Sequence, residues 1–474
     1  MRFFFFIPLL TCLLTFKAEA QALAGKEFIC GFMENEVNQG STLIVYLASD
    51  RYATVDITIP LQGYAVTVNL VPDTVIDITI PLNLAAHAGS EIIEGKAIFI
   101  SASDSILVYL LHRHSATSDG ATVFPAEVNA NSYYAVTYKG RNIVNSMAEF
   151  LILAHDSNTL VTITPTDTTA GGQLPGIPFN VVIHQGQSYQ VQAMHDLTGS
   201  LINTSKPVAL FSGNKLVNMP YDIPFHCCGD HLFEQMLPVN FWGNEYVTAP
   251  LMSRDSGDTY RIIAKDDSTI VYLNGVVTDT LNAGKFCEWR IKVASVISAD
   301  KPILVTQYAN SQNFDGTVGD PFIISLLPAG NWYSKTLFKT YTCFGCNFSY
   351  YVNLVTLSTW ISTVKVNGST IPSSSFQIIQ GTVYSYTTIQ VNGGIHRIES
   401  DSGFIAYYYA FDTGYESYGI ALPGYGHHII TGISNIKTIW NKIDLWPNPL
   451  TENFLKVKLP ETLSVSGFTV SITD

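Results

Sequence analysis

Charged side chains are scarce in this 474-residue sequence. Asp, Glu, Lys and Arg make up 13% of it, about half the share that is usual for soluble domains. The 25 basic residues are outnumbered by 38 acidic ones, which gives a net charge of -13. Nucleic-acid binders and proteins that dock on anionic lipid need a basic surface, so the charge balance argues against both classes. Hydrophobic residues make up 47%, which excludes wholesale disorder.

Long apolar runs are missing after the first twenty residues, so we expect no transmembrane segment in the mature chain. The one run, at residues 3–16, follows Arg2 and precedes a small-x-small site at residues 18–20. A positive start, a short apolar stretch and such a site are typical of a signal peptide. We therefore expect residues 1–20 to be removed on export.

Cysteine is sparse, and one of the seven lies inside the signal peptide. An even number of remaining cysteines in an exported chain is consistent with disulfides, although six cysteines leave the pairing open. Cys343 and Cys346 have the C-x-x-C spacing of redox motifs, but their surroundings predict strand, turn and strand rather than a helix start. We favour a small bridge over a turn. The disulfide candidates are Cys30, Cys227, Cys228, Cys287, Cys343 and Cys346.

The densest polar cluster lies at residues 226–235 (HCCGDHLFEQ). His226, Cys227, Cys228 and His231 are possible zinc ligands, since zinc prefers imidazole and thiolate. Adjacent cysteines do not both point easily at one tetrahedral ion, so we favour a disulfide-stapled loop and keep zinc as the alternative. The segment from Asp230 could also form one short helix. No cofactor is expected.

Convincing helical periodicity is absent elsewhere, and the chain is rich in Thr, Val, Ile and aromatic residues, which suit β-sheets. One sequence phrase recurs, starting at Ile100, Ile202, Ile297 and Ile398. It consists of an apolar strand, a Ser-x-Asp/Lys-Pro step and a second apolar strand. These copies are roughly 100 residues apart, longer than the ~20–50 residues of most solenoid or propeller repeats. We expect an all-β protein of about four tandem β-sandwich-like repeats, with a closed propeller-like toroid as the alternative.

An apolar-Pro step follows each copy, and we expect the chain to cross between repeats there. Asn274-Gly275 and Asn367-Gly368 predict hairpin turns within repeats. The predicted organisation is a signal peptide (1–20), four repeats (21–125, 126–238, 239–328 and 329–425), a linker (426–442) and a C-terminal domain (443–474).

Catalytic motifs are missing: there is no G-x-S-x-G elbow, H-E-x-x-H, phosphate loop or dinucleotide fingerprint. Asp255 and Asp258 could form a carboxylate pair for glycoside hydrolysis, but the segment is more simply a solvated loop. We therefore predict a non-enzymatic protein, with a secreted carbohydrate hydrolase as one alternative.

The run from Ser212 to Gly275, with SGNKLVNMP, CCGDHLFEQMLPVNFWGNEYVTAP and RIIAKDDSTIVYLNG, resembles the amino-terminal domain family of IgG Fc-binding protein. LNAGKF, ISADKPILVTQYA and DGTVGDPFIISLLP continue the likeness, which extends over most of residues 120–425. The resemblance implies an extracellular, non-enzymatic binding or matrix module. Antibody binding and individual binding residues do not transfer with it.

The tail, with DLWPNP from Asp444 and then ENFLKVKLPE and SGFTVSITD, is similar to the start of a type IX secretion sorting domain. That resemblance implies a Bacteroidota source and export by the type IX machinery. The tail is shorter than the family's domain and lacks its closing strands.

We therefore expect a secreted or cell-surface adhesin-like protein that recognises an extracellular glycoprotein or glycan, mucin being the guessed ligand class. A structural matrix or sheath component is the other alternative. Tyrosine offers contact area at low entropic cost. The candidate contact aromatics are Tyr408, Tyr415, Tyr418 and Tyr425.

The first testable prediction is that Cys343 and Cys346 form a disulfide. Peptide mapping without reduction should recover the two cysteines in one linked peptide. Free thiols at both positions would rule the bridge out.

Overall fold

The structure, a computed structural model, describes residues 23–140, 146–221, 228–413 and 416–426, and the backbone of two short strands, β31 (Asp444–Trp446) and β32 (Lys456–Lys458). Ala22–His428 form one compact unit, and β31 and β32, which pair antiparallel, belong to a second. The predicted signal peptide, the linker after residue 426 and most of the predicted sorting domain lie outside the described residues.

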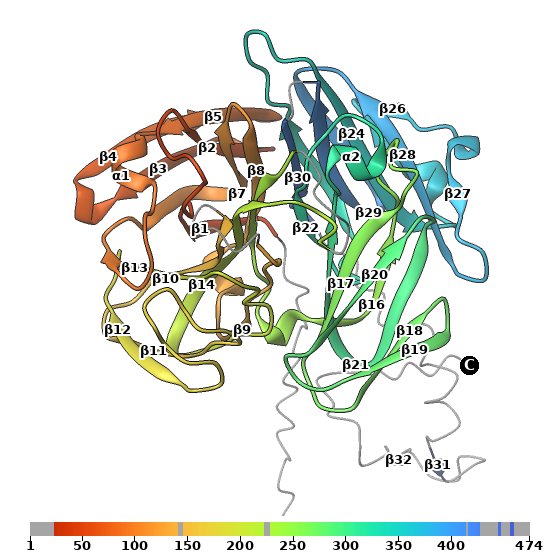
Figure 1. Cartoon of the computed structure of the whole chain (residues 1–474). Coiled ribbons are helices and arrows are strands. Elements are labelled where there is room, and N and C mark those ends of the chain that lie inside the picture. Colours follow the sequence, from red (N-terminus) through yellow and green to blue (C-terminus); the bar gives the residue numbers. More distant parts are fainter. Residues whose placement is uncertain are drawn as a thin grey trace, which may run out of the picture. The chain divides into compact units, whose positions relative to one another are not determined.

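Four antiparallel sheets follow one another along the chain, and Figure 1 shows them as successive colour blocks. Repeat 1 consists of β1 (Gly25–Cys30), β2 (Thr42–Ser49), β3 (Ala53–Ile59), β4 (Tyr64–Leu70), β5 (Thr74–Ile80), β7 (Ile98–His114) and β8 (Thr117–Val123). Repeat 2 consists of β9 (Ala130–Tyr134), β10 (Ala148–Ala154), β11 (Thr159–Thr164), β12 (Phe179–Ile183), β13 (Ser188–Ala193), β14 (Leu201–Val217) and β15 (Asp230–Gln235), joined by β6 (Ile93–Glu94).

The other two sheets make up the second half of the chain. Repeat 3 consists of β16 (Gly243–Thr248), β17 (Asp258–Ala264), β18 (Thr269–Leu273), β19 (Val276–Leu281), β20 (Phe286–Ile291), β21 (Ser295–Tyr308) and β22 (Ile323–Ser325). Repeat 4 consists of β23 (Tyr333–Lys339), β24 (Phe348–Leu357), β25 (Lys365–Val366), β26 (Ser369–Thr370), β27 (Gln377–Ile378), β28 (Tyr384–Val391), β29 (Ile395–Asp412) and β30 (Glu416–Ala421). The all-β class and the tandem repeats are confirmed.

Helices in the described residues are single turns. They are η1 (Pro60–Gln62), α1 (Leu82–Ala85), η2 (Ala126–Val128), η4 (Val239–Phe241), α2 (Gln312–Asp315), η5 (Ile361–Thr363) and η6 (Ser373–Ser375). None in this part of the chain is long and apolar enough to cross a membrane.

One long strand organises each repeat: β7, β14, β21 or β29. Its first half pairs with the first and third strands of the repeat, and its second half pairs with the second and the last. The recurrent phrase is therefore one continuous strand, not two strands joined by a turn. Pro207 and Pro302 are tolerated inside it because the register with the neighbouring strand shifts at both places, where no ladder donor is needed.

Alternation of apolar and polar residues places one face of each sheet in the core. In β3, Val55, Ile57 and Ile59 are buried, while the alternating residues Thr54 and Asp56 are exposed. The same core cluster continues into repeat 2. At the Asn274-Gly275 turn both residues have positive φ, 50° and 79°, which is the hairpin geometry that the sequence predicts.

The last strands of the repeats, β8, β15, β22 and β30, are named here the inner strands. Every described residue in them is buried. β8 packs on β15 and β30, and β22 packs on the same two strands. Figure 1 shows β8, β22 and β30 close together between the repeats. Each inner strand is followed by its apolar-Pro step, which leads to the next repeat, as the sequence predicts.

Asp119 of β8 links all four inner strands through one carboxylate. Its Oδ1 accepts the backbone N–H of Gly120 (2.8 Å) and of Gly419 in β30 (3.2 Å). Its Oδ2 accepts the N–H of Phe233 in β15 (3.0 Å) and of Ile323 in β22 (3.1 Å). Asp119 is fully buried, so no water replaces these bonds.

Glycine lets the inner strands approach so closely. A Cβ on Gly120 would lie 2.5 Å from the Ile420 side chain, and one on Gly419 would lie 2.5 Å from the Phe322 ring. Any other residue at either position would push two inner strands apart.

Contacts between neighbouring repeats form a closed cycle. Arg261 in repeat 3 pairs with Asp196 in repeat 2 at 2.7 Å, and the Asn353 amide in repeat 4 donates to the Ala249 carbonyl in repeat 3 at 3.2 Å. Repeat 4 also meets repeat 1, where the Lys339 N–H donates to the Tyr109 hydroxyl at 2.7 Å. The cycle is a feature of the toroidal alternative, while each repeat keeps its own sheet.

Replacing Asp119 by Ala should destabilise the protein severely. Four buried N–H groups would lose their acceptor, at about 1–3 kcal/mol each, so we expect a loss of about 4 kcal/mol or more in the free energy of unfolding. Denaturant titration measures it. Asp56→Ala is the control, because Asp56 is exposed and should cost less than ~1 kcal/mol. Equal losses for the two variants would contradict the role of Asp119.

Candidate functional site

A pocket of about 390 Å³ opens on repeat 4, beside the hairpin of β25 and β26 and the end of β28. It exists because the Asn367-Gly368 turn, with φ of 50° and 80°, folds this short hairpin back at the start of β29. The lining residues are Val366, Asn367, Ser369, Thr370, Ile371, Pro372, Ser375, Ile389, Gln390, Val391, Asn392 and His396.

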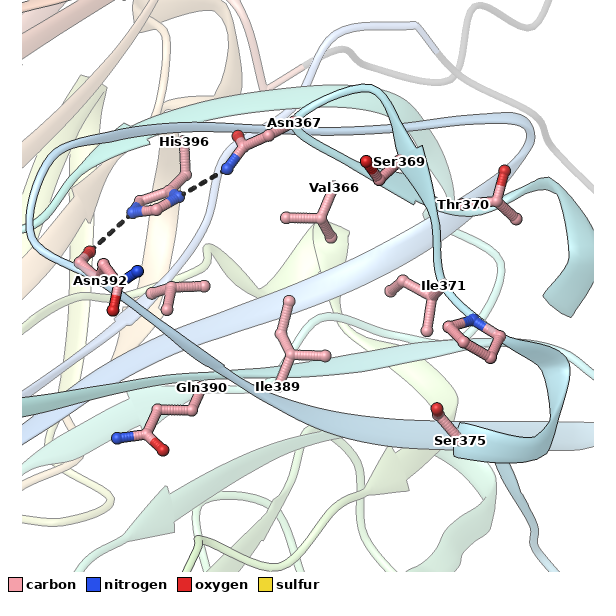
Figure 2. Close-up of a pocket in the computed structure, with 12 residues that line it drawn as sticks. Val366, Asn367, Ser369, Thr370, Ile371, Ser375, Ile389, Gln390, Asn392 and His396 are labelled. Atoms are coloured by element: carbon pink, nitrogen blue, oxygen red, sulfur yellow. Dashed lines mark hydrogen bonds between the residues drawn. The ribbon is translucent and has the colours of Figure 1, made fainter.

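Aliphatic side chains from two sides of the pocket supply its apolar surface. Val366 and Ile389 extend toward one another across it, and Ile371 lies beside them (Figure 2). Around them stand hydroxyl and amide groups. None of the lining residues is an Asp, Glu, Lys, Arg or Cys, so the pocket is suited to an uncharged ligand with both apolar and hydrogen-bonding parts.

His396 fixes one wall of the pocket. Its Nδ1 lies 3.1 Å from the Asn367 amide nitrogen, which must be the donor, so Nδ1 accepts. Its Nε2 lies 2.8 Å from the Asn392 carbonyl oxygen and therefore donates. Figure 2 shows both bonds. Both ring nitrogens are thus engaged, and the imidazole positions the two asparagines.

Five polar side chains of the pocket keep their hydrogen-bonding capacity for a ligand. No side-chain hydrogen bond to another described residue involves them, and all are exposed. They are Ser369, Thr370, Ser375, Gln390 and Asn392. Hydroxyls and amides both donate and accept, so the rim can match either kind of neutral polar group.

Cys343 and Cys346 form a disulfide with a Cα–Cα distance of 5.3 Å. The bridge closes a turn in which the Cys346 N–H donates to the Cys343 carbonyl at 3.3 Å. Phe344 at the tip is fully exposed. The Arg113 guanidinium lies 3.9 Å from each sulfur and pairs with Glu416 at 2.9 Å, so the loop rests on the contact between repeats 1 and 4.

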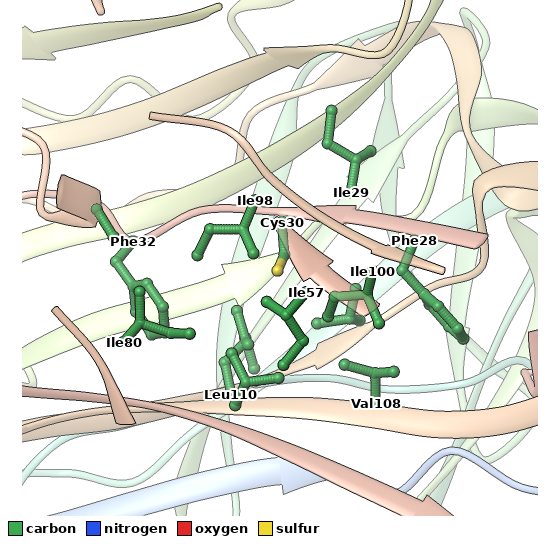
Figure 3. Packing of buried hydrophobic residues seen from close by; sticks show 14 of the residues in the cluster. Phe28, Ile29, Cys30, Phe32, Ile57, Ile80, Ile98, Ile100, Val108 and Leu110 are labelled. Atoms are coloured by element: carbon green, nitrogen blue, oxygen red, sulfur yellow. The ribbon is translucent and has the colours of Figure 1, made fainter. Parts of the chain in front are cut away.

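Cys30 and Cys287 are buried free thiols, not bridge partners. They lie on β1 and β20, in different repeats. Cys30 packs among Ile57, Ile98 and Ile100 in the core (Figure 3). Burial raises the pKa of the Cys287 thiol to about 12, so it stays protonated and unreactive. The prediction that these two cysteines form disulfides is therefore wrong. Both side chains are buried as free thiols.

The segment from Asp230 is not a helix, because it forms β15, which is buried along its whole length. His231 is buried, donates from Nδ1 to the Asn214 carbonyl at 2.8 Å, and packs its ring 5.0 Å from that of His112. Cys228 is disulfide-bonded. His226 and Cys227 lie outside the described residues. Among the residues that are described, no group of three or more His, Cys, Asp or Glu could hold a metal ion.

The predicted contact tyrosines are placed differently from expectation. Tyr408 and Tyr418 are 1% and 2% exposed and share a hydrogen bond of 2.6 Å between their hydroxyls. They face the core because Tyr408 lies in the second half of β29 and Tyr418 lies in β30, and both of these segments are buried on both faces. Tyr425 is half-buried and donates to the Ala48 carbonyl at 3.0 Å. Tyr415 lies outside the described residues.

Buried carboxyls gather at and beside the inner strands. Burial raises the pKa of Glu234 to about 8 and the pKa values of Asp258 and Asp320 to about 7. Glu234 accepts backbone N–H bonds from β8 and β22. Asp258 is buried and accepts the Leu251 N–H at 2.9 Å, whereas Asp255 is exposed.

These observations describe an all-β repeat protein with an uncharged pocket on repeat 4. A family model described as IgGFc binding protein matches residues 119–410, more than half of the chain. The chain belongs to this family, and the resemblance drawn from the Ser212–Gly275 run is confirmed at that level. The human (Homo sapiens) IgGFc-binding protein is 24% identical over 410 residues, which are 82% of this chain and 7% of that relative. The chain thus corresponds to a small part of the human protein.

None of the pocket residues is among the candidate site residues that the sequence predicts. Its residues are ordinary neutral side chains, and the one local signal is Asn367-Gly368, which predicts a turn but no site. The hairpin, β28 and the start of β29 come together only through the sheet.

The raised pKa of Asp320 predicts that the stability of the protein depends on pH. Its folded-state pKa of about 7 exceeds its ordinary value of 3.8, so protonation favours the folded chain. This stability is present below pH 3.8 and is lost as pH rises through about 7. Asp320→Asn should remove the loss, gaining on the order of 2 kcal/mol over wild type between pH 5 and pH 8.

Calorimetric unfolding at both pH values measures the effect. Asp255→Asn, an exposed carboxyl nearby, is the control and should keep the wild-type pH dependence. If the Asp320→Asn protein loses stability with pH as steeply as wild type does, Asp320 is not the responsible group.

Proposed function

We propose that this chain is a secreted or cell-surface binding protein without enzymatic activity, and that it recognises an uncharged part of an extracellular glycoprotein, mucin included. The observation that carries the proposal is the pocket of repeat 4, where five free neutral side chains surround an aliphatic surface. The family membership supports a binding role. Export through the type IX machinery is part of the proposal and rests on the sequence of the tail.

The alternatives receive less support from the same pocket. A carbohydrate hydrolase needs two convergent carboxyl groups, and none lines this pocket. A matrix component would need contacts between copies of the chain, which is a separate question from ligand binding.

A glycan and glycoprotein array that includes mucins and immunoglobulins tests the proposal on the purified full chain. Saturable binding to one class is the expected result. The double substitution Gln390→Ala and Asn392→Ala should weaken it roughly tenfold or more, because two hydrogen bonds of about 1 kcal/mol each are lost.

Gln185→Ala in repeat 2 is the matched control, since Gln185 is exposed and far along the chain from the pocket residues. Binding that is unchanged by the double substitution would place the ligand elsewhere. A blank array with a folded protein would refute the binding proposal for these classes.

A further inference from the structure

The disulfide between Cys343 and Cys346 lies at the surface, unlike the buried free thiols of the chain. Both of its cysteines are only half-buried, and the two residues between them, Phe344 and Gly345, are exposed. The neighbours on either side, Thr342 and Asn347, are exposed as well. A molecule in solution can therefore approach this bridge, as exchange between a thiol and a disulfide requires.

The Arg113 guanidinium lies against both sulfurs of the bridge. Its Nη2 is 3.9 Å from the Sγ of Cys343 and 3.9 Å from the Sγ of Cys346. Its Nε–H is buried and has no acceptor among the described residues, so the guanidinium keeps an unused donor. A guanidinium is always charged in proteins. A negative charge that develops on either sulfur is therefore stabilised by a cation that is already in place.

This cation replaces a feature that the local sequence lacks. Reactive C-x-x-C cysteines commonly lie at the N-terminus of a helix, which stabilises their thiolate. Here a turn and then β24 follow Cys346, so the sequence context favours an inert bridge. Arg113 belongs to β7 in repeat 1 and is 230 residues away from Cys343 in the chain. The contact between repeats 1 and 4 brings the positive charge to the motif.

Two buried carboxyl groups also lie near the loop. Glu416 pairs with the same Nη2 of Arg113 at 2.9 Å, and Asp412 accepts the Asn347 N–H at 2.7 Å. Glu416 offsets part of the guanidinium charge. Arg113 and Glu416 are therefore expected to change the chemistry of the sulfurs in opposite directions, although they form one ion pair.

We propose that the bridge between Cys343 and Cys346 exchanges with the thiol of another molecule, and that Arg113 stabilises the sulfur that leaves. The incoming thiolate forms a new S–S bond to one of the two cysteines, and the original S–S bond breaks. The electron pair of the broken bond stays on the other cysteine, which becomes a thiolate beside Arg113. The number of disulfides is unchanged, so no further oxidant or reductant is needed.

The product is a reversible covalent contact with the partner. Attack by the new thiolate on the mixed disulfide restores the bridge and releases the partner thiol. Each bridge holds one partner at a time, so the step is a form of binding and not a turnover. It does not involve the pocket of repeat 4, so its failure is read separately from failure of the proposed function.

The partner thiol can come from a small molecule or from a cysteine in a polypeptide. The exposed Phe344 ring stands between the two reacting cysteines and can pack on an apolar residue beside a partner cysteine. This favours a polypeptide, and the two sources are distinguished below.

The rate at which an excess of 2-mercaptoethanol opens the bridge in the purified full chain tests the proposal. Samples are quenched by alkylation, and the peptides are quantified by mass spectrometry. Peptide-level reading separates this bridge from Cys228, which is also disulfide-bonded. Cys30 and Cys287 are buried thiols and should stay unlabelled in a folded chain, so labelling there identifies a variant that has unfolded.

Four variants give the expected pattern. Arg113→Gln should slow the reaction roughly fivefold, and Arg113→Lys should restore most of the rate because the ammonium keeps the charge. Glu416→Gln should speed the reaction roughly twofold, because the guanidinium charge is no longer offset. Arg51→Gln removes an exposed arginine elsewhere in repeat 1 and is the control, with the wild-type rate expected.

A purely structural ion pair predicts a different pattern. Loss of either partner would then loosen the loop, and both Arg113→Gln and Glu416→Gln would speed the reaction. That result would overturn the proposal, and so would a wild-type rate in Arg113→Gln. A wild-type bridge that opens only when Cys30 and Cys287 become labelled would overturn it too, since the bridge would then react only in the unfolded chain.

Two synthetic peptides distinguish the sources of the thiol. Each carries one cysteine, flanked on both sides by Leu in one peptide and by Ser in the other. A faster reaction of the Leu peptide, together with loss of the difference in Phe344→Ser, identifies a polypeptide as the partner. Tyr52→Ser, which removes another exposed aromatic ring, is the control and should keep the difference. Equal rates for the two peptides identify a small thiol.

Discussion

The arrangement of the four repeats depends on a single buried carboxylate, that of Asp119. Asp119 accepts N–H groups from all four inner strands, so four repeats that are distant in sequence share one acceptor. Burial raises the pKa of Asp119 well above its usual range, and the N–H bonds lower it. The four N–H bonds offset only part of the rise that burial causes. The carboxylate is therefore held only while all four strands are in place, which couples the repeats to one another.

The closed cycle of contacts joins the four sheets into one structural unit. Repeat 4 touches repeat 3 through Asn353 and repeat 1 through Lys339, so it is held from both sides. Both the pocket beside Asn367 and the disulfide loop that carries Phe344 belong to repeat 4. Binding elements placed on a support of this kind lose little entropy when they meet a partner.

Much of the fold could be predicted from the sequence because strand alternation, Asn-Gly turns and the roughly 100-residue period are local or repeated signals. The Asp230 segment shows the limit. Its spacing allows a helix, yet it forms β15, because the surrounding strands bury it on every side. Tyr408 and Tyr418 show the same limit: the sequence predicts tyrosine-rich segments, but the face they occupy depends on which sheets cover them.

The amino-acid sequence by itself determined the all-β class, the number of repeats, the bridge-forming spacing of Cys343 and Cys346, and the scarcity of charge. These properties depend on neighbouring residues and on composition. Only the tertiary structure decided that Asp119 links the inner strands, that Cys30 and Cys287 are core thiols, and that neutral residues from a hairpin, β28 and the start of β29 line one pocket. The physical reason is that burial and long-range pairing depend on the packing of sheets, and no local pattern records which distant strand covers a given face.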